Sequence, residues 1–150
     1  MNLILWRHAE AEDGTPDRER ALTHRGLKQA GRMAKWLMER LPEDMVILAS
    51  PAKRTLQTAR MLNLDFQVVA ELATSGSPES LLSAIKWPAT RGSVVVVGHQ
   101  PTLGETAALL LTDRKAQWSI KKGAVVWLAR RDNDVPARVT LRAAISPDLL

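Results

Sequence analysis

The stretch VVVVGHQP, residues 94–101, is the strongest indicator of the fold: four consecutive valines are followed by Gly98 and His99. A continuous apolar run without polar alternation is typical of a strand that is buried on both faces. Two further runs have the same character, residues 3–6 (LILW) and residues 45–48 (MVIL). Because such strands occur in parallel sheets covered by helices, the three runs predict an α/β fold.

Helical patterns alternate with these runs. Apolar side chains recur at helical spacing from Leu27 to Leu41, with Thr23 as the expected N-cap residue and Pro42 as the stop. The other expected elements are helices over residues 52–62, 78–87 and 102–111 and strands over residues 66–69, 125–129 and 139–143, the last two as an antiparallel pair. We therefore predict one domain over residues 1–150, a three-layer α/β sandwich with a mainly parallel central sheet flanked by helices.

The composition limits the classes of partner. The chain has 21 Lys and Arg against 16 Asp and Glu, a formal net charge of +5, but charges of both signs are mixed along it. With one Phe and no Tyr, few aromatic side chains are available to stack on bases, so we expect no nucleic-acid partner. No apolar stretch approaches the roughly 20 residues that span a bilayer, so we expect no membrane contact. A monomer in the cytoplasm is the expected state.

Metal binding is a further possibility to weigh. The chain has no cysteine, which removes disulfides and thiolate metal sites. His8, Glu10 and Glu12 recur at every second residue, but this spacing matches no common metal-binding motif. We therefore interpret the two glutamates as loop acids or as acids that gate access of the substrate, and we expect no metal.

The ends of the three predicted strands carry the residues that indicate a chemistry. Arg7 and His8 follow the first run, Arg54 comes shortly after the second, and His99 follows the third. In open α/β sheets, ligands bind beyond the carboxyl ends of the strands. The planar guanidinium group of arginine matches pairs of phosphate oxygens, and a neutral imidazole can attack phosphorus. The four residues therefore predict a site for phosphoryl transfer.

The ordered set of motifs resembles the histidine phosphatase superfamily, which has the phosphoglycerate mutase-like fold, and within it the compact phosphohistidine phosphatases of the SixA type. The matching residues, in chain order, are Arg7-His8, Arg20-Ala21-Leu22-Thr23, Gly26, Gln29-Ala30, Ser50-Pro51, Arg54-Thr55, Gln57-Thr58-Ala59, Glu71-Leu72, and Gly98-His99 with Pro101. The resemblance implies that His8 becomes phosphorylated and that Arg7, Arg54 and His99 complete the phosphate pocket. It also implies that no metal or organic cofactor takes part.

Three positions depart from the family pattern or allow more than one interpretation. The first motif of the family usually ends in glycine, whereas this chain has Ala9; we expect activity to survive, because a backbone with negative φ accepts the methyl group. Larger relatives place a proton-donating acid after the third strand, and the candidates here are Glu71 and, as a poorer match, Glu79. Arg20 is a candidate for the substrate pocket, the other interpretation being an ion pair with Asp17 or Glu19. It lies near the end of a long irregular stretch, residues 9–21, of the kind that is often functional.

These observations predict a phosphatase that acts through a covalent phosphohistidine on a phosphohistidine of a signalling or phosphorelay protein, such as a histidine-containing relay domain. The chain is short and leaves little room for the insertions that cover the active site in larger relatives, which suits a phosphoryl group displayed on another protein. A weak proton donor also favours a nitrogen leaving group over an alkoxide, which needs the proton. Two alternatives stay open: a phosphatase of small phosphate monoesters, and a phosphate- or phosphoprotein-binding module without turnover.

Overall fold

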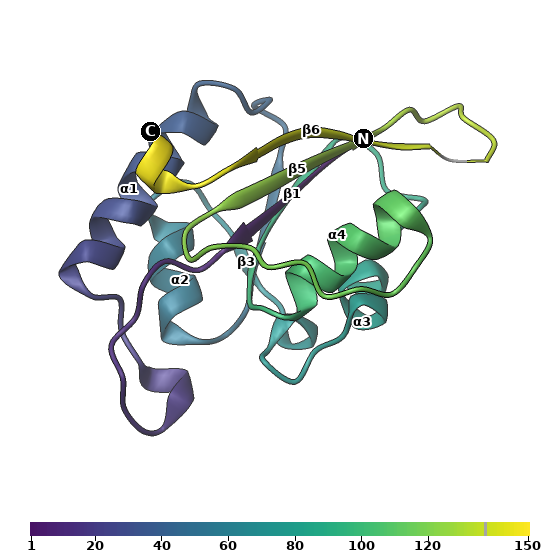
Figure 1. Ribbon diagram of the computed structural model, residues 1–150. Helices are drawn as coiled ribbons and strands as arrows, with labels where there is room; N and C mark the ends of the chain where they lie inside the picture. The colour runs from purple at the N-terminus through teal and green to yellow at the C-terminus, as the bar shows by residue number, and fades with distance from the viewer. Residues whose placement is uncertain (137) are drawn as a thin grey trace.

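The computed structural model describes residues 1–136 and 138–150 and contains one six-stranded mixed sheet (Figure 1). The strand order is β3-β2-β4-β1-β5-β6; β3, β2, β4 and β1 run parallel, whereas β5 and β6 are antiparallel to their neighbours. The strands are β1 (Asn2–Arg7), β2 (Val46–Ala49), β3 (Gln67–Val68), β4 (Ser93–Gly98), β5 (Val125–Arg130) and β6 (Val139–Ile145). The mainly parallel sheet and the antiparallel final pair are confirmed.

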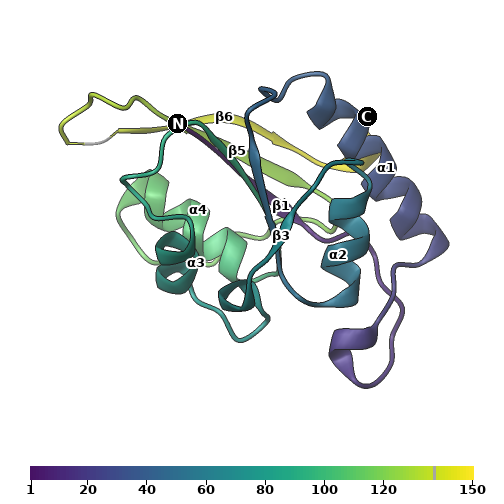
Figure 2. The same cartoon turned by 180° about the vertical axis from the view of Figure 1, so that it is seen from behind.

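Helices cover both faces of the sheet. They are α1 (His24–Met38), α2 (Lys53–Arg60), α3 (Pro78–Ala84) and α4 (Thr102–Thr112), with short 3-10 turns η1 (Asp17–Glu19), η2 (Ala70–Leu72) and η3 (Pro147–Leu149). Figure 1 shows α1 and α2 on one side of the sheet and α3 and α4 on the other, and Figure 2 shows the same arrangement from behind. The three-layer α/β sandwich is therefore confirmed.

The side chains of β1 point alternately to the two faces of the sheet and pack into two separate hydrophobic cores. Ile4 and Trp6 belong to the core under α1 and α2, whereas Leu3 and Leu5 belong to the core under α3 and α4. All four side chains are buried. Successive side chains of a strand point to opposite faces, so an unbroken apolar run is what a strand between two helical layers requires.

The predicted helix starts are confirmed, but three predicted ends lie two or three residues too far along the chain, among them that of α2, which ends at Arg60 rather than at residue 62. Thr23 caps α1 by accepting a hydrogen bond from the Gly26 N–H at 2.9 Å. Helix α1 ends at Met38 rather than near Pro42, because the chain tightens there and the Arg40 N–H bonds back to the Leu37 carbonyl, only three residues earlier. Helix α3 ends at Ala84, and Lys86 adopts a left-handed φ of 56°, which a continuing helix does not allow.

The parallel strands bring their carboxyl ends to one edge of the sheet. His8 follows β1 directly, Ser50 follows β2 directly, and His99 follows β4 directly. The loop after β1 approaches α1 closely: a Cβ on Gly26 would lie 2.0 Å from the Glu10 carbonyl oxygen. Only glycine permits this approach, which holds the loop after His8 against the helix. Within the described ranges, none of the helices combines the length and apolar character of a membrane span.

Candidate active site

His8 and His99 lie side by side because they continue two neighbouring parallel strands. In the register of β1 and β4, Arg7 pairs with Gly98, and the His8 N–H donates to the Gly98 carbonyl at 3.0 Å. The two imidazole ring centroids are 5.3 Å apart. Residues 91 positions apart in sequence therefore share one site, as predicted from the strand ends.

The tautomer of His8 follows from its hydrogen bonds. Its Nδ1 lies 2.7 Å from the Ala9 carbonyl oxygen, which can only accept, so Nδ1 carries the proton. Its Nε2 accepts a hydrogen bond from Arg54 Nε at 3.3 Å. Burial above all, helped by the charges of His99, Arg54 and Arg7, lowers the pKa of His8 to about 3, although the hydrogen bond to Ala9 acts in the opposite direction. At neutral pH, His8 therefore offers an unprotonated Nε2, the form that can act as a nucleophile.

Arg54 connects the two histidines. It comes from the first turn of α2 and is only 4% exposed. Besides the contact with His8, its Nη2 lies 3.5 Å from His99 Nδ1. A buried guanidinium group beside both imidazoles provides the charge that an anionic phosphoryl group would need.

Arg7 adds a second guanidinium group with a free donor. Its Nη1 donates to the Ile120 carbonyl at 2.7 Å, which orients the side chain. Its Nε is buried, and no described residue accepts a hydrogen bond from it. A buried N–H without an acceptor is costly, and a bound anion would satisfy it.

Ser50 orients His99. The Ser50 Oγ lies 2.7 Å from His99 Nε2 and accepts a weaker hydrogen bond from the Ala52 N–H at 3.4 Å. Burial, followed by the positive charge of Arg54, lowers the pKa of His99 to about 4. His99 is therefore neutral at neutral pH in this structure, and the negative charge of a phosphoryl group would favour its protonation.

Asp17 occupies the outer edge of Arg54. Its Oδ2 lies 3.0 Å from Arg54 Nη2, and its backbone carbonyl accepts from Arg54 Nη1 at 2.9 Å. Its other carboxylate oxygen binds Arg20 Nη1 at 2.9 Å. Hydrogen bonds from Arg20 and Arg54 lower the pKa of Asp17, so it is a carboxylate that competes with phosphate for one guanidinium group.

Comparison with known proteins agrees with this geometry. Residues 3–74 match the model of the "Histidine phosphatase superfamily (branch 1)". A protein of Haemophilus influenzae described as a phosphohistidine phosphatase SixA homolog is 31% identical over 130 residues, which cover 76% of this chain and 79% of that protein. The chain belongs to the histidine phosphatase superfamily.

Among solved structures, those of SixA proteins are similar to this member of the superfamily. The structure of the protein histidine phosphatase SixA complexed with tungstate has a TM-score of 0.82 and 26% identity, and the match covers 99% of both chains. A phosphoserine phosphatase of Entamoeba histolytica has a TM-score of 0.73 at 17% identity, covering 99% of this chain and 98% of that one; this match shows the shared fold alone. The phosphoglycerate mutase-like fold and a phosphatase of SixA-like type are thereby supported.

Arg20 and Glu71, the two remaining residues predicted for the site, differ in how they relate to it. Arg20 forms the ion pair with Asp17 and donates from Nε to the Glu12 carbonyl at 2.7 Å, so it acts on the site through Asp17. Glu71 lies in η2 and is exposed, and within the described chain its carboxylate makes no hydrogen bond or ion pair with the site residues. Its neighbour Thr74 lines a hollow of about 70 Å³ together with Asp17. The segment after β3 therefore borders the site, but the role of Glu71 stays a prediction.

Sequence reasoning missed two contacts. Asp17 carried no motif signal beyond its place in the long loop, and its pairing with Arg54 depends on how that loop folds over α2. Thr58 lies in the matched motif but received no role; its Oγ1 donates to the Arg54 carbonyl at 2.8 Å and accepts from the Ala9 N–H at 3.2 Å. Thr58 therefore ties the loop after His8 to the helix that carries Arg54.

The structure accommodates Ala9 at the position where the family motif usually has glycine. Ala9 is fully buried and does not belong to the positive-φ residues of the described chain. Its methyl group packs in the core under α1 and α2.

Among the described residues, no three or more His, Cys, Asp or Glu side chains form a group that could hold a metal ion.

Neutralising Asp17 is expected to tighten the binding of inorganic phosphate. Asp17→Asn keeps the shape of the side chain but removes the charge that competes for Arg54, so we expect a Kd lower by roughly tenfold at low ionic strength. Isothermal titration calorimetry with phosphate measures this. Glu19→Gln is the matched control, because Glu19 is an exposed carboxylate in the same 3-10 turn. Equal tightening in both variants would show a general charge effect rather than a contact with Arg54.

The buried histidines are expected to make the protein sensitive to acid. In the unfolded chain they bind protons as the pH falls through about 6.5, whereas in the folded protein they stay neutral until about 3 for His8 and about 4 for His99. Stability is therefore lost as the pH falls below 6.5, by up to about 4 kcal/mol at pH 5 from the pair.

Urea unfolding at pH 7.5 and pH 5 tests this expectation. The double variant His8→Asn/His99→Asn should lose less stability over that range than the unmodified protein. His24→Asn is the control, because His24 is exposed at the start of α1. An unchanged loss of stability in the double variant would contradict the burial of two neutral imidazoles as its cause.

Proposed function

We propose that this protein is a phosphohistidine phosphatase in which His8 Nε2 takes the phosphoryl group. The observation that carries the proposal is the tautomer of His8. The Ala9 carbonyl holds the proton on Nδ1, and Nε2 faces Arg54 in a buried site with a second arginine. This arrangement provides a nucleophile and preorganised positive charge at the same point.

The proposed reaction has two steps. His8 Nε2 attacks phosphorus, the N–P bond of the substrate breaks in line with the attack, and the leaving nitrogen takes a proton. As Nε2 bonds to phosphorus, the Arg54 Nε–H no longer donates a hydrogen bond to this nitrogen and donates instead to a phosphoryl oxygen. The Arg7 Nε–H donates to a second phosphoryl oxygen. Water then attacks phosphorus, the Nε2–P bond breaks and a proton of the water passes to solvent, so phosphate is released and His8 is again neutral with its proton on Nδ1.

The choice of a phosphohistidine substrate is supported by the position of the acids. Asp17 is the only carboxylate that contacts Arg54 among the described residues, and it is held as an anion by Arg20 and Arg54. Glu71 is exposed and makes no contact with the histidines in the described chain. A phosphoramidate has a basic leaving nitrogen and takes its proton from solvent more readily than an alkoxide, so a site with a weak general acid favours it.

A substrate comparison tests the function. We expect rapid hydrolysis of a histidine-containing relay domain phosphorylated on histidine, and at least about 100-fold lower kcat/KM for aryl, sugar and nucleotide phosphate monoesters. Release of inorganic phosphate is measured for each. A preference for a monoester would assign the enzyme to small phosphate esters. Tight binding of vanadate without hydrolysis of any substrate would indicate a binding module and contradict the proposal.

A further inference from the structure

A groove lined mainly by cations lies beside the site, between α1 and the C-terminal 3-10 turn. Its volume is about 250 Å³, and we call it the basic groove. In Figure 1 the C-terminus and η3 lie against α1. Its lining residues are Arg25, Lys28, Gln29 and Arg32 of α1, Lys121 and Lys122 before β5, and Pro147 and Asp148 of η3.

The floor of the basic groove is joined to the segment that carries His8. The Gln29 Oε1 accepts a hydrogen bond from the Glu10 N–H at 3.0 Å. Gly123, which follows Lys122, donates from its N–H to the His8 carbonyl at 3.0 Å. A Cβ on Gly123 would lie 3.4 Å from the Gln29 Cβ, so the turn before β5 and helix α1 meet here. The groove therefore opens at the same edge of the sheet as the two histidines.

Most of the positive charge in the groove is uncompensated. Asp148 pairs with Lys121 at 3.1 Å, and Glu10 approaches Arg25 at 3.7 Å. Lys28, Arg32 and Lys122 form no ion pair with any residue that the structure describes. All three are exposed.

The arrangement of charges along α1 is unfavourable for the helix itself. Arg25, Lys28 and Arg32 follow one another at spacings of three and four residues, where like charges repel. The first turn of α1 contains no acidic residue, although the helix dipole favours acids there. An anionic surface bound in the basic groove would relieve both penalties.

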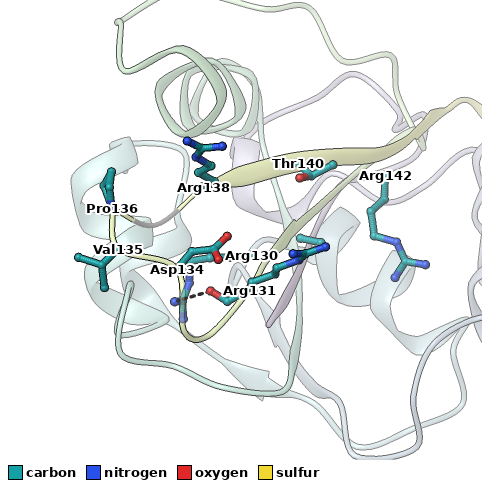
Figure 3. Close-up of a pocket in the computed structure, with 9 residues that line it drawn as sticks. Arg130, Arg131, Asp134, Val135, Pro136, Arg138, Thr140 and Arg142 are labelled. Atoms are coloured by element: carbon teal, nitrogen blue, oxygen red, sulfur yellow. Dashed lines mark hydrogen bonds between the residues drawn. The ribbon is translucent and has the colours of Figure 1, made fainter.

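A second collection of arginines lies at the opposite edge of the sheet (Figure 3). It surrounds a larger hollow of about 640 Å³ at the β5–β6 hairpin. The Arg130 N–H bonds to the Met1 carbonyl, at the start of β1, which places this hollow away from His8. The side chains of Arg138, just before β6, and of Arg142, within β6, point in different directions in Figure 3. These arginines do not adjoin the histidines, and they provide a matched control.

We propose that the basic groove binds an acidic surface of the phosphorylated protein, next to its phosphohistidine. This inference rests on the proposed function and adds a property of the substrate: carboxylate side chains close to the phosphorylated histidine. An extended peptide advances about 3.3 Å per residue, so a few residues beyond the phosphohistidine reach the neighbouring cations. Exposed charge pairs of this kind act mainly on encounter and therefore on kcat/KM.

Two synthetic peptides test the proposal. They have the same length and one central histidine phosphorylated with phosphoramidate; one has glutamates around it, and the other has glutamines. We expect the kcat/KM of the acidic peptide to exceed that of the neutral peptide by about tenfold at low salt and the preference to shrink as salt is added. The ratio of the two values cancels any difference in the amount of folded enzyme.

Charge reversal in the groove completes the experiment. The variant Arg32→Glu/Lys122→Glu should lower the ratio to about one or below. The variant Arg131→Glu/Arg138→Glu has the same change in net charge at the opposite edge and should keep the ratio of the unmodified enzyme.

Four outcomes would overturn the proposal. The first is a ratio near one in the unmodified enzyme, and the second is an equal fall of the ratio in both variants. The third is tighter binding of a short DNA duplex than of the acidic peptide, lost on charge reversal in the groove, which would assign the groove to nucleic acid. The fourth is hydrolysis of neither peptide, which would remove the proposed function itself and with it this role of the groove.

Discussion

His8→Ala is expected to abolish turnover of a phosphohistidine substrate, with a loss of kcat on the order of 10⁴-fold or more. His8 Nε2 is the imidazole nitrogen that faces Arg54 Nε without a proton, so its removal eliminates the atom that would bond to phosphorus. Incubation with a radioactive phosphodonor and acid-labile labelling measure the covalent step directly. The label should appear on the unmodified enzyme and be absent from the variant.

Two further variants make this result specific. His8→Asn retains an amide N–H that can donate to the Ala9 carbonyl but has no nucleophilic nitrogen, so it should fold and be equally inactive. His24→Ala removes an exposed histidine on α1 and should keep full activity. Turnover by His8→Ala at a rate close to that of the unmodified enzyme, or a label that moves to His99, would contradict the proposed nucleophile.

Arg54→Lys is expected to lower kcat/KM by about 10² to 10³-fold, although the charge is kept. The guanidinium group of Arg54 contacts His8 Nε2, His99 Nδ1 and Asp17 at the same time. A lysine ammonium group is a single point charge and cannot reproduce this planar set of contacts. Steady-state kinetics on the phosphorylated relay domain provide the measurement.

The control for Arg54→Lys lies on the same helix. Arg60 is exposed at the end of α2, and Arg60→Lys should change kcat/KM by less than about twofold. Circular dichroism and thermal unfolding of both variants separate folding from catalysis. A kcat/KM of Arg54→Lys within threefold of that of the unmodified enzyme would show that a positive charge alone suffices. It would contradict the role proposed for the planar guanidinium group of Arg54.

Much of the fold could be predicted from the sequence because its strands are buried on both faces. Runs such as residues 94–97 have no polar alternation, and the structure places them in the parallel part of the sheet. Helix starts were predicted correctly where a cap residue determines them, as at Thr23. Helix ends were less accurate, because the end of α3 depends on a left-handed residue, Lys86, that has no strong local signal.

The residues that meet at the carboxyl ends of the strands could be predicted from the order of motifs along the chain. Parallel strands that alternate with helices bring their carboxyl ends together, so His8, His99 and Arg54 converge once the order of strands is known. Arg20 illustrates the limit of this reasoning. Its two interpretations, substrate pocket or ion pair, could not be separated until the structure placed its guanidinium group on Asp17.

The protonation states of the site residues depend on the packing of distant segments and could not be predicted from local sequence. The proton on His8 Nδ1 follows from the Ala9 carbonyl, and the lowered pKa values of both histidines follow from burial, which no local sequence pattern encodes. The carboxylate on Arg54 and the cations beside Gln29 likewise depend on loops and strands distant in sequence. Local patterns specify where elements begin and what chemistry they carry, whereas desolvation and charge balance arise only when the packed elements exclude water from the groups between them.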